Sequence, residues 1–325
     1  MKPQTILYTC VIVLSAALAR PGATISEGRD ASPLLLIVPG FQTPESVIHD
    51  RDADVYLVSN VGAGNPGAID HNGFISIVSP RGEIVTLKWI ADGVNGATLN
   101  GPKGLWIRGD ALYVTDVDTL RIFDRVTGLP IRSIPFPDPF SNPLFLNDVV
   151  VADNGVAYVT DTANSAIFRV DRNDHVTVLA SGPQLQTPNG ILVKGERVSW
   201  VTFFGHQVLS LNPTTGVSVD ATLPAVDVSA VGLPPGTLLL DGYARLPDGS
   251  TLVTSWVTGK VYRISASRRE ITTIAKFVSL LENPANPNGP ADINVDVARH
   301  RLLVPLFNMN QLVILRLDGD TGDAQ

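Results

Sequence analysis

The apolar and polar positions of this chain repeat as pairs of short segments. The first segment of each pair begins with a polar or charged residue and continues into an apolar run, and the six starting residues are Glu45, Lys103, Asn147, Asn189, Asp241 and Asp292. After a polar turn comes a second, mostly apolar run, and these runs are Val55–Val58, Leu112–Thr115, Ala157–Thr160, Val198–Val201, Thr251–Thr254 and Leu302–Pro305. Short apolar runs bounded by turn residues predict buried strands.

The spacing of the pairs indicates a repeat architecture. The six starting residues lie 58, 44, 42, 52 and 51 residues apart, and propeller blades of four strands repeat with periods of about 40–50 residues. The third repeat shows four strands, predicted at Asn147–Ala152, Val156–Thr160, Ala166–Asp171 and Val176–Ala180. No segment of convincing length has the helical period. The pattern therefore predicts an all-β fold, a six-bladed β-propeller.

The two ends of the repeat region complement each other. The sixth repeat ends with the run Gln311–Leu317 and an acidic tail, so it lacks a fourth strand. A spare apolar run, Leu34–Val38, precedes the first repeat. Pairing these two segments would close the ring and leave no open edge. We therefore expect one propeller domain over residues 34–325.

The first residues predict export. Lys2, an apolar stretch from Thr5 to Ala16 and the small residues Ala17 and Ala19 fit a signal peptide over residues 1–19. Residues 20–33 are polar and small, which suggests a flexible leader. We expect a secreted or periplasmic protein that leaves the membrane after signal cleavage. An uncleaved anchor or a lipoprotein is the alternative.

Composition excludes several classes of function. The net charge of −7 and the pI near 5.2 argue against nucleic acids and anionic membrane surfaces as partners. Cys10 is the only cysteine, and it falls in the predicted signal peptide, so thiolate metal sites and cysteine nucleophiles are not expected. The chain has no histidine pair with zinc spacing, no Gly-x-Ser-x-Gly elbow and no phosphate-binding glycine loop. We expect a monomer that acts on a small molecule.

Four of the starting residues carry oxygen ligands for a hard cation. If the repeats converge on one axis, Glu45, Asn147, Asn189 and Asp241 surround a single point, as calcium requires. Each residue alone is equally consistent with a solvated strand end or an ordinary turn. Their common position in four repeats favours a metal site.

Other polar residues are expected at the same end of the propeller. Lys103 and Asp292 hold the equivalent position in the second and sixth repeats, where a charge pair, substrate contacts or a structural salt bridge are all consistent with the sequence. Antiparallel strands bring the loops with His206 and Trp256 to that face. Asp148, beside Asn147, could orient a ligand.

These residues together resemble the senescence-marker-protein/gluconolactonase family of six-bladed propellers. Its relatives include diisopropylfluorophosphatase, the paraoxonases and strictosidine-synthase-like proteins. The resemblance covers the whole mature chain, and Thr-Pro-Asn-Gly at 187–190 is its most typical motif. It implies one calcium ion in the central tunnel, held by Glu45, Asn147, Asn189 and Asp241.

The sequence also departs from this family. Glu45-Ser-Val-Ile stands where Glu-Gly-Pro-x-Trp is usual, and Asp241 is followed by Gly-Tyr rather than Gly-Met or Gly-Leu. The substrate-contacting Arg and Asn of sugar lactonases are not recognisable around Lys103. The resemblance therefore supports the metal site better than a preference for sugar lactones.

Two functions follow as expectations. The first is a calcium-dependent hydrolase of a lactone or related ester, with Asp241 or His206 as general base. Lys103, Trp256 and Asp292 would contact its substrate. The alternative is a non-enzymatic propeller of the cell envelope that binds a ligand or protein and holds a structural metal.

Overall fold

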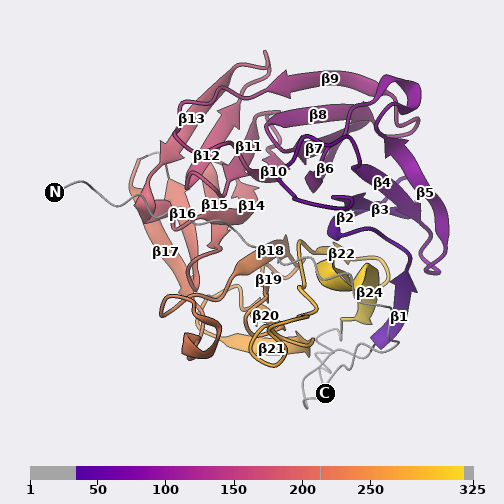
Figure 1. The fold of residues 1–325 in the computed structure, drawn as a ribbon. Coiled ribbons are helices and arrows are strands. Elements are labelled where there is room, and N and C mark those ends of the chain that lie inside the picture. Colours follow the sequence, from indigo (N-terminus) through magenta and orange to yellow (C-terminus); the bar gives the residue numbers. More distant parts are fainter. Residues whose placement is uncertain (1–33, 213, 318–325) are drawn as a thin grey trace, which may run out of the picture.

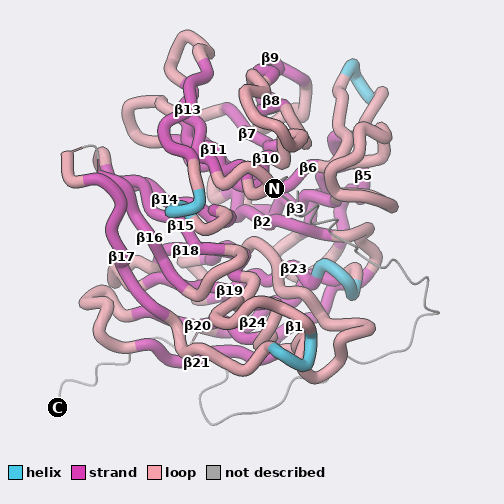
Figure 2. Tube along the Cα trace, turned by 60° about the vertical axis from the view of Figure 1, so that its left-hand side comes forward, coloured by secondary structure: helices cyan, strands magenta, loops and turns pink. Residues whose placement is uncertain are grey.

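The strands form six four-stranded antiparallel sheets arranged as blades around a central axis (Figure 1). The structure, a computed structural model, describes residues 34–212 and 214–317. Figure 2 shows strands throughout the ring and only short helical turns in the loops. The six-bladed β-propeller predicted from the repeat is confirmed. The predicted signal peptide and leader fall outside the described residues.

The blades follow one another along the chain, and the first strand of blades 1–5 lies nearest the axis. Blade 1 contains β2 (Pro44–Asp50), β3 (Val55–Asn60), β4 (Phe74–Val78) and β5 (Ile84–Ala91). Blade 2 contains β6 (Pro102–Arg108), β7 (Ala111–Asp116), β8 (Thr119–Asp124) and β9 (Pro130–Pro135). Blade 3 contains β10 (Leu146–Val151), β11 (Ala157–Asp161), β12 (Ala166–Val170) and β13 (Val176–Ser181).

The other three blades have the same order of strands. Blade 4 contains β14 (Pro188–Lys194), β15 (Arg197–Thr202), β16 (Gln207–Asn212) and β17 (Gly216–Thr222). Blade 5 contains β18 (Leu240–Arg245), β19 (Thr251–Ser255), β20 (Lys260–Ile264) and β21 (Ile271–Lys276). Blade 6 contains β22 (Asn294–Asp296), β23 (Arg301–Leu306), β24 (Gln311–Arg316) and β1 (Leu34–Pro39). Short 3-10 helices occupy Val94–Gly96, Pro183–Leu185, Ser229–Val231 and Phe307–Met309.

A separate hydrophobic cluster fills each space between neighbouring blades. Alternate residues of a strand face opposite sides of its sheet. In β10, Val149 and Val151 therefore pack toward blade 2, while Val150 packs toward blade 4. Because both faces of each blade are buried, the inner strands consist of nearly continuous apolar residues. This explains why the sequence shows apolar runs rather than a clean alternation.

The N-terminal strand closes the ring. β1 pairs antiparallel with β24, with Val38 opposite Leu312 and Ile37 opposite Val313. Val38 also joins the cluster between blades 6 and 1, where it is 3% exposed. The closure predicted from the unpaired segments at the two ends is confirmed.

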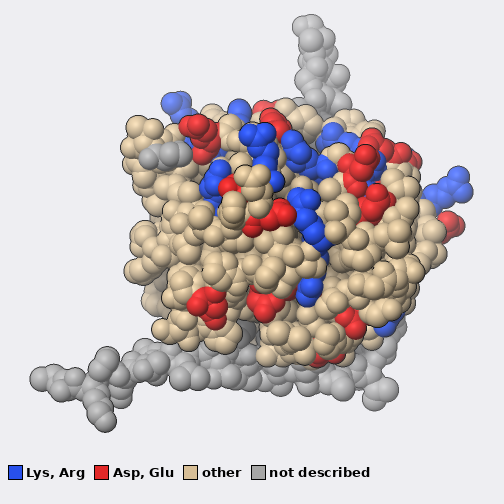
Figure 3. Space-filling model, turned by 90° about the horizontal axis from the view of Figure 1, so that it is seen from above, with Lys and Arg blue, Asp and Glu red and all other residues tan. Residues whose placement is uncertain are grey.

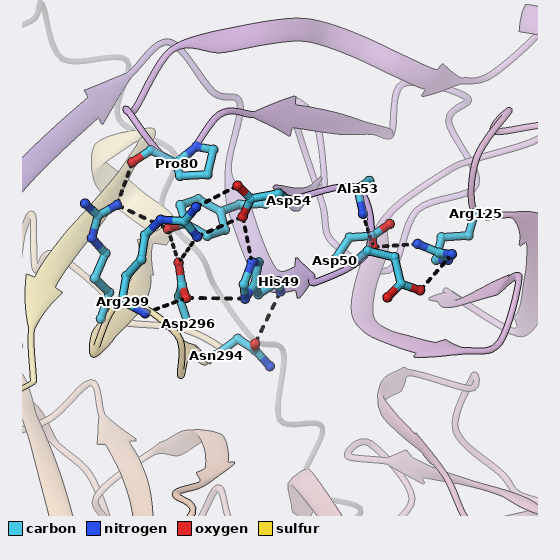
Figure 4. Close-up of polar contacts among 12 residues, drawn as sticks. His49, Asp50, Ala53, Asp54, Pro80, Arg125, Asn294, Asp296 and Arg299 are labelled. Atoms are coloured by element: carbon cyan, nitrogen blue, oxygen red, sulfur yellow. Dashed lines mark hydrogen bonds and ion pairs between the residues drawn. The ribbon is translucent and has the colours of Figure 1, made fainter.

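Polar contacts reinforce this seam at one end of the propeller (Figure 4). Arg299 donates to Asp54 at 2.8 and 2.6 Å and to Asp296 at 3.0 Å, so it joins blade 6 to blade 1. Asp296 also accepts a hydrogen bond of 2.8 Å from the Tyr56 hydroxyl. His49 lies between Asp54 and Asp296, with ring nitrogens 3.5 and 3.6 Å from their carboxylates. The seam therefore combines β pairing, apolar packing and an ion-pair network.

Charged side chains are unevenly distributed over the outer wall. On the side carrying β8, β9 and β13, they gather toward one end of the propeller, and the other end is mostly uncharged (Figure 3). The sequence fits this distribution, because turns that follow the inner strands contain residues such as Asp110 and Asp153. None of the helices in residues 34–212 and 214–317 is long and apolar enough to cross a membrane.

Blade 6 differs from the prediction at its inner strand. The sequence pattern starts this strand at Asp292, but β22 begins at Asn294 and has three residues. The backbone N–H of Asp292 donates to the Glu45 carbonyl at 2.9 Å, across the seam. Its hydrogen bond is thus made to blade 1 rather than to β23.

Candidate functional site

Five of the six predicted residues occupy the same place, the second position of an inner strand. They are Glu45 in β2, Lys103 in β6, Asn147 in β10, Asn189 in β14 and Asp241 in β18. Asp292 lies two residues before β22. None of the six is more than 8% exposed.

Each inner strand carries one extra residue at this place. In blade 1, Glu45 and Ser46 lie opposite the single residue Ser59, because Pro44 pairs with Asn60 and Val47 pairs with Val58. The other five blades show the same offset of one residue. Such a bulge changes the direction of a side chain within a strand. It lets a strand that otherwise packs between blades present one polar residue toward the axis.

Hydroxyl groups opposite the bulges tie neighbouring inner strands together. The Thr160 hydroxyl accepts from the Asp148 backbone N–H at 3.0 Å and donates to the Asn189 carbonyl at 2.9 Å. The Thr254 hydroxyl likewise accepts from the Gly242 N–H at 2.7 Å and donates to the Ala291 carbonyl at 3.1 Å. In these two places a single hydroxyl therefore links the inner strands of neighbouring blades.

Glycine follows three of the ring residues because the inner strands approach closely there. A Cβ at Gly190 would lie 2.5 Å from the Asp241 carbonyl oxygen, and one at Gly242 would lie 2.6 Å from that of Ala291. A Cβ at Gly104 would lie 2.6 Å from the Asp148 Cα. These glycines do not have positive φ. Their role is therefore steric, rather than the turn chemistry that Asn-Gly and Asp-Gly pairs suggest.

We expect Gly190→Ala to destabilise the protein by roughly 3 kcal/mol, because the added methyl group must displace backbone. Chemical denaturation would measure the change. Gly67→Ala is the matched control: it also lacks positive φ, and its Cβ would meet nothing closer than 3.4 Å. Equal stability of the two variants would contradict the close approach of blades 4 and 5 at the axis.

Two of the carboxylates at these equivalent strand positions, those of Glu45 and Asp241, have an oxygen without a hydrogen-bond partner. Glu45 Oε2 and Asp241 Oδ1 are buried and accept no hydrogen bond within the described chain. Burial, with repulsion from Asp241 and Asp292, raises the pKa of Glu45 well above its usual value. Burial and repulsion from Asp292 also raise the pKa of Asp241. Carboxylates from blades 1, 5 and 6 therefore lie close enough to repel one another, and a bound cation would offset that cost.

Two amides, Asn147 and Asn189, hold the equivalent position in blades 3 and 4. Asn147 Nδ2 donates to the Thr162 hydroxyl at 3.1 Å, and that hydroxyl donates to the Pro188 carbonyl at 2.8 Å. This contact orients the amide and leaves Asn147 Oδ1 available. Asn189 is 2% exposed and makes no side-chain hydrogen bond in residues 34–212 and 214–317. Carboxylate and amide oxygens together suit calcium.

A metal at this place would depend on the amide oxygens. Among the described residues, no group of three or more His, Cys, Asp or Glu side chains is arranged to hold a metal ion. The ring offers Glu45 and Asp241 as its predicted anionic ligands, with Asn147 and Asn189 completing the set. This composition does not fit zinc, which prefers nitrogen and sulfur ligands.

Trp256 holds Asp241 in place. Its indole Nε1–H donates to Asp241 Oδ2 at 2.8 Å. The indole ring packs near Phe307, with the ring centroids 5.3 Å apart, and near Val61 and Ala291. One oxygen of Asp241 is thus fixed, while Oδ1 stays unpaired.

Lys103 is enclosed rather than open to solvent. It is 1% exposed, its Nζ donates to the Gly101 carbonyl at 3.0 Å, and it lies 4.4 Å from the centre of the Phe145 ring. Burial lowers the pKa of Lys103 to about 8, against the opposing attraction of Glu45 and Asp116. No ion pair in the described residues joins Lys103 to Asp292.

Asp148 and Asp292 line a cavity enclosed by the inner strands. This cavity has a volume of about 170 Å³, and its walls include Val47, Leu105 and Ile191. The Ser46 hydroxyl donates to Asp292 at 2.6 Å, and the Ile191 backbone N–H donates to Asp148 at 2.9 Å. Burial raises the pKa of Asp292 to about 6 and that of Asp148 well above its usual value.

His206 lies in the loop between β15 and β16. Its Nδ1 is 2.8 Å from the Gly236 carbonyl oxygen, which can only accept, so Nδ1 carries the proton in the neutral ring. Nε2 is then the basic nitrogen. No hydrogen bond or ion pair between described residues connects His206 to Glu45 or Asp241.

The structure adds two positioning contacts that the sequence did not reveal, Thr162 to Asn147 and Ser46 to Asp292. Ser46 directly follows Glu45, and Thr162 directly follows the end of β11. Their position at the end of the propeller where the metal ligands were expected was the only sign in the sequence that these hydroxyl groups could contact Asn147 and Asp292. Trp256 was predicted at this face, but its hydrogen bond to Asp241 in β18 depends on how the side chain after β19 is oriented.

Comparison with known proteins shows the fold. The sequence matches no protein-family model, and a search of curated proteins gives no match. A streptogramin B lyase structure shares 14% identity and a TM-score of 0.57, over 89% of this chain and 97% of that one. An inactive virginiamycin B lyase from Staphylococcus aureus with quinupristin shares 12% identity and a TM-score of 0.54, over 91% and 99% of the two chains.

A protein described as a proposed gluconolactonase gives a similar result. It shares 12% identity and a TM-score of 0.58, over 87% of this chain and 92% of the other. At these identities the similarity establishes the architecture alone. The six-bladed propeller implied by the resemblance to gluconolactonase-like proteins is thereby confirmed.

Proposed function

We propose that this protein is a calcium-dependent hydrolase of a lactone or related ester. The observation that carries the proposal is the pair of buried, unpaired carboxylate oxygens, Glu45 Oε2 and Asp241 Oδ1. Leaving two such groups without partners is costly unless a cation or substrate group engages them. Their equivalent positions in blades 1 and 5 indicate a built site rather than an accident of packing.

The proposed metal ligands are Glu45, Asn147, Asn189 and Asp241. Two anionic and two amide oxygens match the preference of calcium for hard ligands in flexible geometry. Magnesium is smaller and keeps more of its water, so it fits a preformed protein ring less well. If the chain is exported, as its first residues predict, a site of modest affinity would suffice, since extracellular calcium modules bind at about 10⁻⁴–10⁻³ M.

Asp241 is the proposed general base. Bound calcium would polarise the carbonyl of the substrate and stabilise the negative charge that develops on its oxygen. Trp256 fixes Oδ2 of Asp241 at 2.8 Å, so Oδ1 would both contact the metal and accept a proton from an attacking water, through separate lone pairs. Phe307 and Val61 beside Trp256 supply an apolar wall for the substrate. His206 is the second candidate base, through Nε2.

Removing calcium tests the metal and the reaction together. Ligand binding to the native state alone stabilises it by about 3 kcal/mol at a hundredfold excess over the dissociation constant. We therefore expect EDTA to lower the melting temperature and to stop hydrolysis of a panel of lactones and aryl esters. Calcium should restore both, and magnesium should restore less. In Glu45→Gln, addition of calcium should no longer raise the melting temperature.

The possible outcomes separate the proposals. Absence of a divalent ion by elemental analysis, with no effect of EDTA, would sink the metal site. Calcium binding without hydrolysis of any panel member would favour the non-enzymatic binding propeller. Reaction in ¹⁸O-labelled water would distinguish hydrolysis, which places the label in the acid product, from elimination of the kind expected of a lyase.

A further inference from the structure

A second polar groove, of about 320 Å³, lies between blades 4 and 5. Its lining includes residues of β15 and β17, the turn between β20 and β21, and the last residues of β14 and β18. The last residues of β14 and β18, Lys194 and Arg245, lie at the opposite end of these inner strands from Asn189 and Asp241. The groove is therefore separate from the proposed hydrolytic site.

The groove concentrates positive charge on an acidic protein. Four cationic residues line it, Lys194, Arg197, Arg245 and Arg268, against the two acidic residues Asp220 and Asp248. The whole chain carries a net charge of −7. The side chains of Lys194 and Arg245 make no hydrogen bond or ion pair within residues 34–212 and 214–317. Two cations are thus free to bind an anion.

Two buried polar atoms of the same groove are also unpaired. Asp220 Oδ1 is heavily engaged: it accepts from Arg197, from Arg268 at 2.7 Å and from the Ser210 hydroxyl at 2.9 Å. Asp220 Oδ2 is nevertheless buried without a partner, as is the Nε–H group of Arg197. The Asp220 side chain is 3% exposed. The groove therefore offers an acceptor that needs a donor, beside donors that need an acceptor.

We propose that this groove binds a small anion that carries a hydroxyl group beside its charge, such as a hydroxycarboxylate or a phosphorylated sugar. The anionic group accepts from Lys194, Arg245 and the Nε–H of Arg197, and charge-assisted hydrogen bonds of this type are strong. A neighbouring hydroxyl donates to Asp220 Oδ2. A ligand with both features satisfies all the unpaired groups, whereas a simple anion leaves Asp220 Oδ2 unsatisfied.

Isothermal titration calorimetry with four probes tests the inference. Gluconate represents a hydroxycarboxylate, glucose 6-phosphate a phosphorylated sugar, inorganic sulfate an anion that has no hydroxyl group, and glucose a neutral polyol. We expect gluconate or glucose 6-phosphate to bind, sulfate to bind more weakly and glucose not to bind. The stronger of the first two identifies the natural anionic group.

Variants then locate the binding. Lys194→Gln and Arg245→Gln should each weaken it roughly tenfold, the loss expected for one charge-assisted contact. Arg81→Gln is the matched control, since Arg81 is an exposed arginine in the β4–β5 turn of blade 1 and does not line the groove. Binding should persist in EDTA and in Asp241→Asn, which separates this groove from the metal site.

Several results would overturn the inference. One is the absence of binding by both gluconate and glucose 6-phosphate at millimolar concentration, and another is an equal loss of affinity in Arg81→Gln and Arg245→Gln. Loss of binding on addition of EDTA would indicate that the ligand binds at the proposed metal site of Glu45 and Asp241 instead. Sulfate binding as tightly as gluconate and glucose 6-phosphate would refute the role of Asp220 as a hydroxyl acceptor.

Discussion

Deletion of β1 (Leu34–Pro39) should abolish cooperative unfolding of this protein. β1 supplies the fourth strand of blade 6, and without it β24 becomes an unpaired edge. The deletion also exposes Leu312 and Ile314, which are fully buried in the cluster between blades 6 and 1. Because each blade is stabilised by both neighbours, opening one interface weakens the whole ring. Differential scanning calorimetry should show no sharp transition.

Two substitutions in the same strand provide a sharper test. Val38→Asp places a charge in the seam without a partner and should cost roughly 4 kcal/mol. Ile37→Asp is the matched control, because Ile37 is 38% exposed on the neighbouring position, and should cost less than about 1 kcal/mol. A deletion with an unchanged melting temperature, or equal effects of the two substitutions, would rule out this closure as a source of stability.

Asp241→Asn should reduce hydrolysis by roughly 10²–10⁴, the range expected for loss of a general base. The amide keeps the shape of the side chain and one oxygen for the Trp256 indole, but it cannot accept a proton from water at neutral pH. Loss of the negative charge should also weaken calcium binding. Rates should therefore be compared at saturating calcium, so that the chemical step is measured separately from metal affinity.

The control for this variant is Asp248→Asn in the same blade. Asp248 is an exposed carboxylate in the turn after β18, where it pairs with Arg263. The Asp248→Asn variant should retain full hydrolytic activity. Full activity of Asp241→Asn with calcium bound would remove Asp241 as the base and direct attention to His206. Loss of activity in both variants would point to a general effect of charge rather than to the ring.

The sequence by itself determined the number of blades and the way the ring closes. Apolar runs such as Val149–Val151 are buried on both faces of a blade, so they remain visible in the sequence without knowledge of their partners. The sixth repeat lacked a fourth strand and the apolar segment Leu34–Val38 belonged to no repeat, so the two could be paired from the sequence. The common position of Glu45, Asn147, Asn189 and Asp241 could also be recognised in the sequence. Equivalent blades place equivalent residues of the repeat at the same level along the propeller axis.

Only the tertiary structure decided what surrounds those residues. The bulge at Glu45 and Ser46 depends on register with β3, which apolar periodicity does not specify. The indole of Trp256 reaches Asp241 across fifteen residues, and Asp292 meets Ser46 from the other end of the chain. The groove at Asp220 likewise needs blades 4 and 5 side by side. Local patterns specify strands and repeats, whereas unpaired oxygens and free cations arise only when distant side chains are brought together.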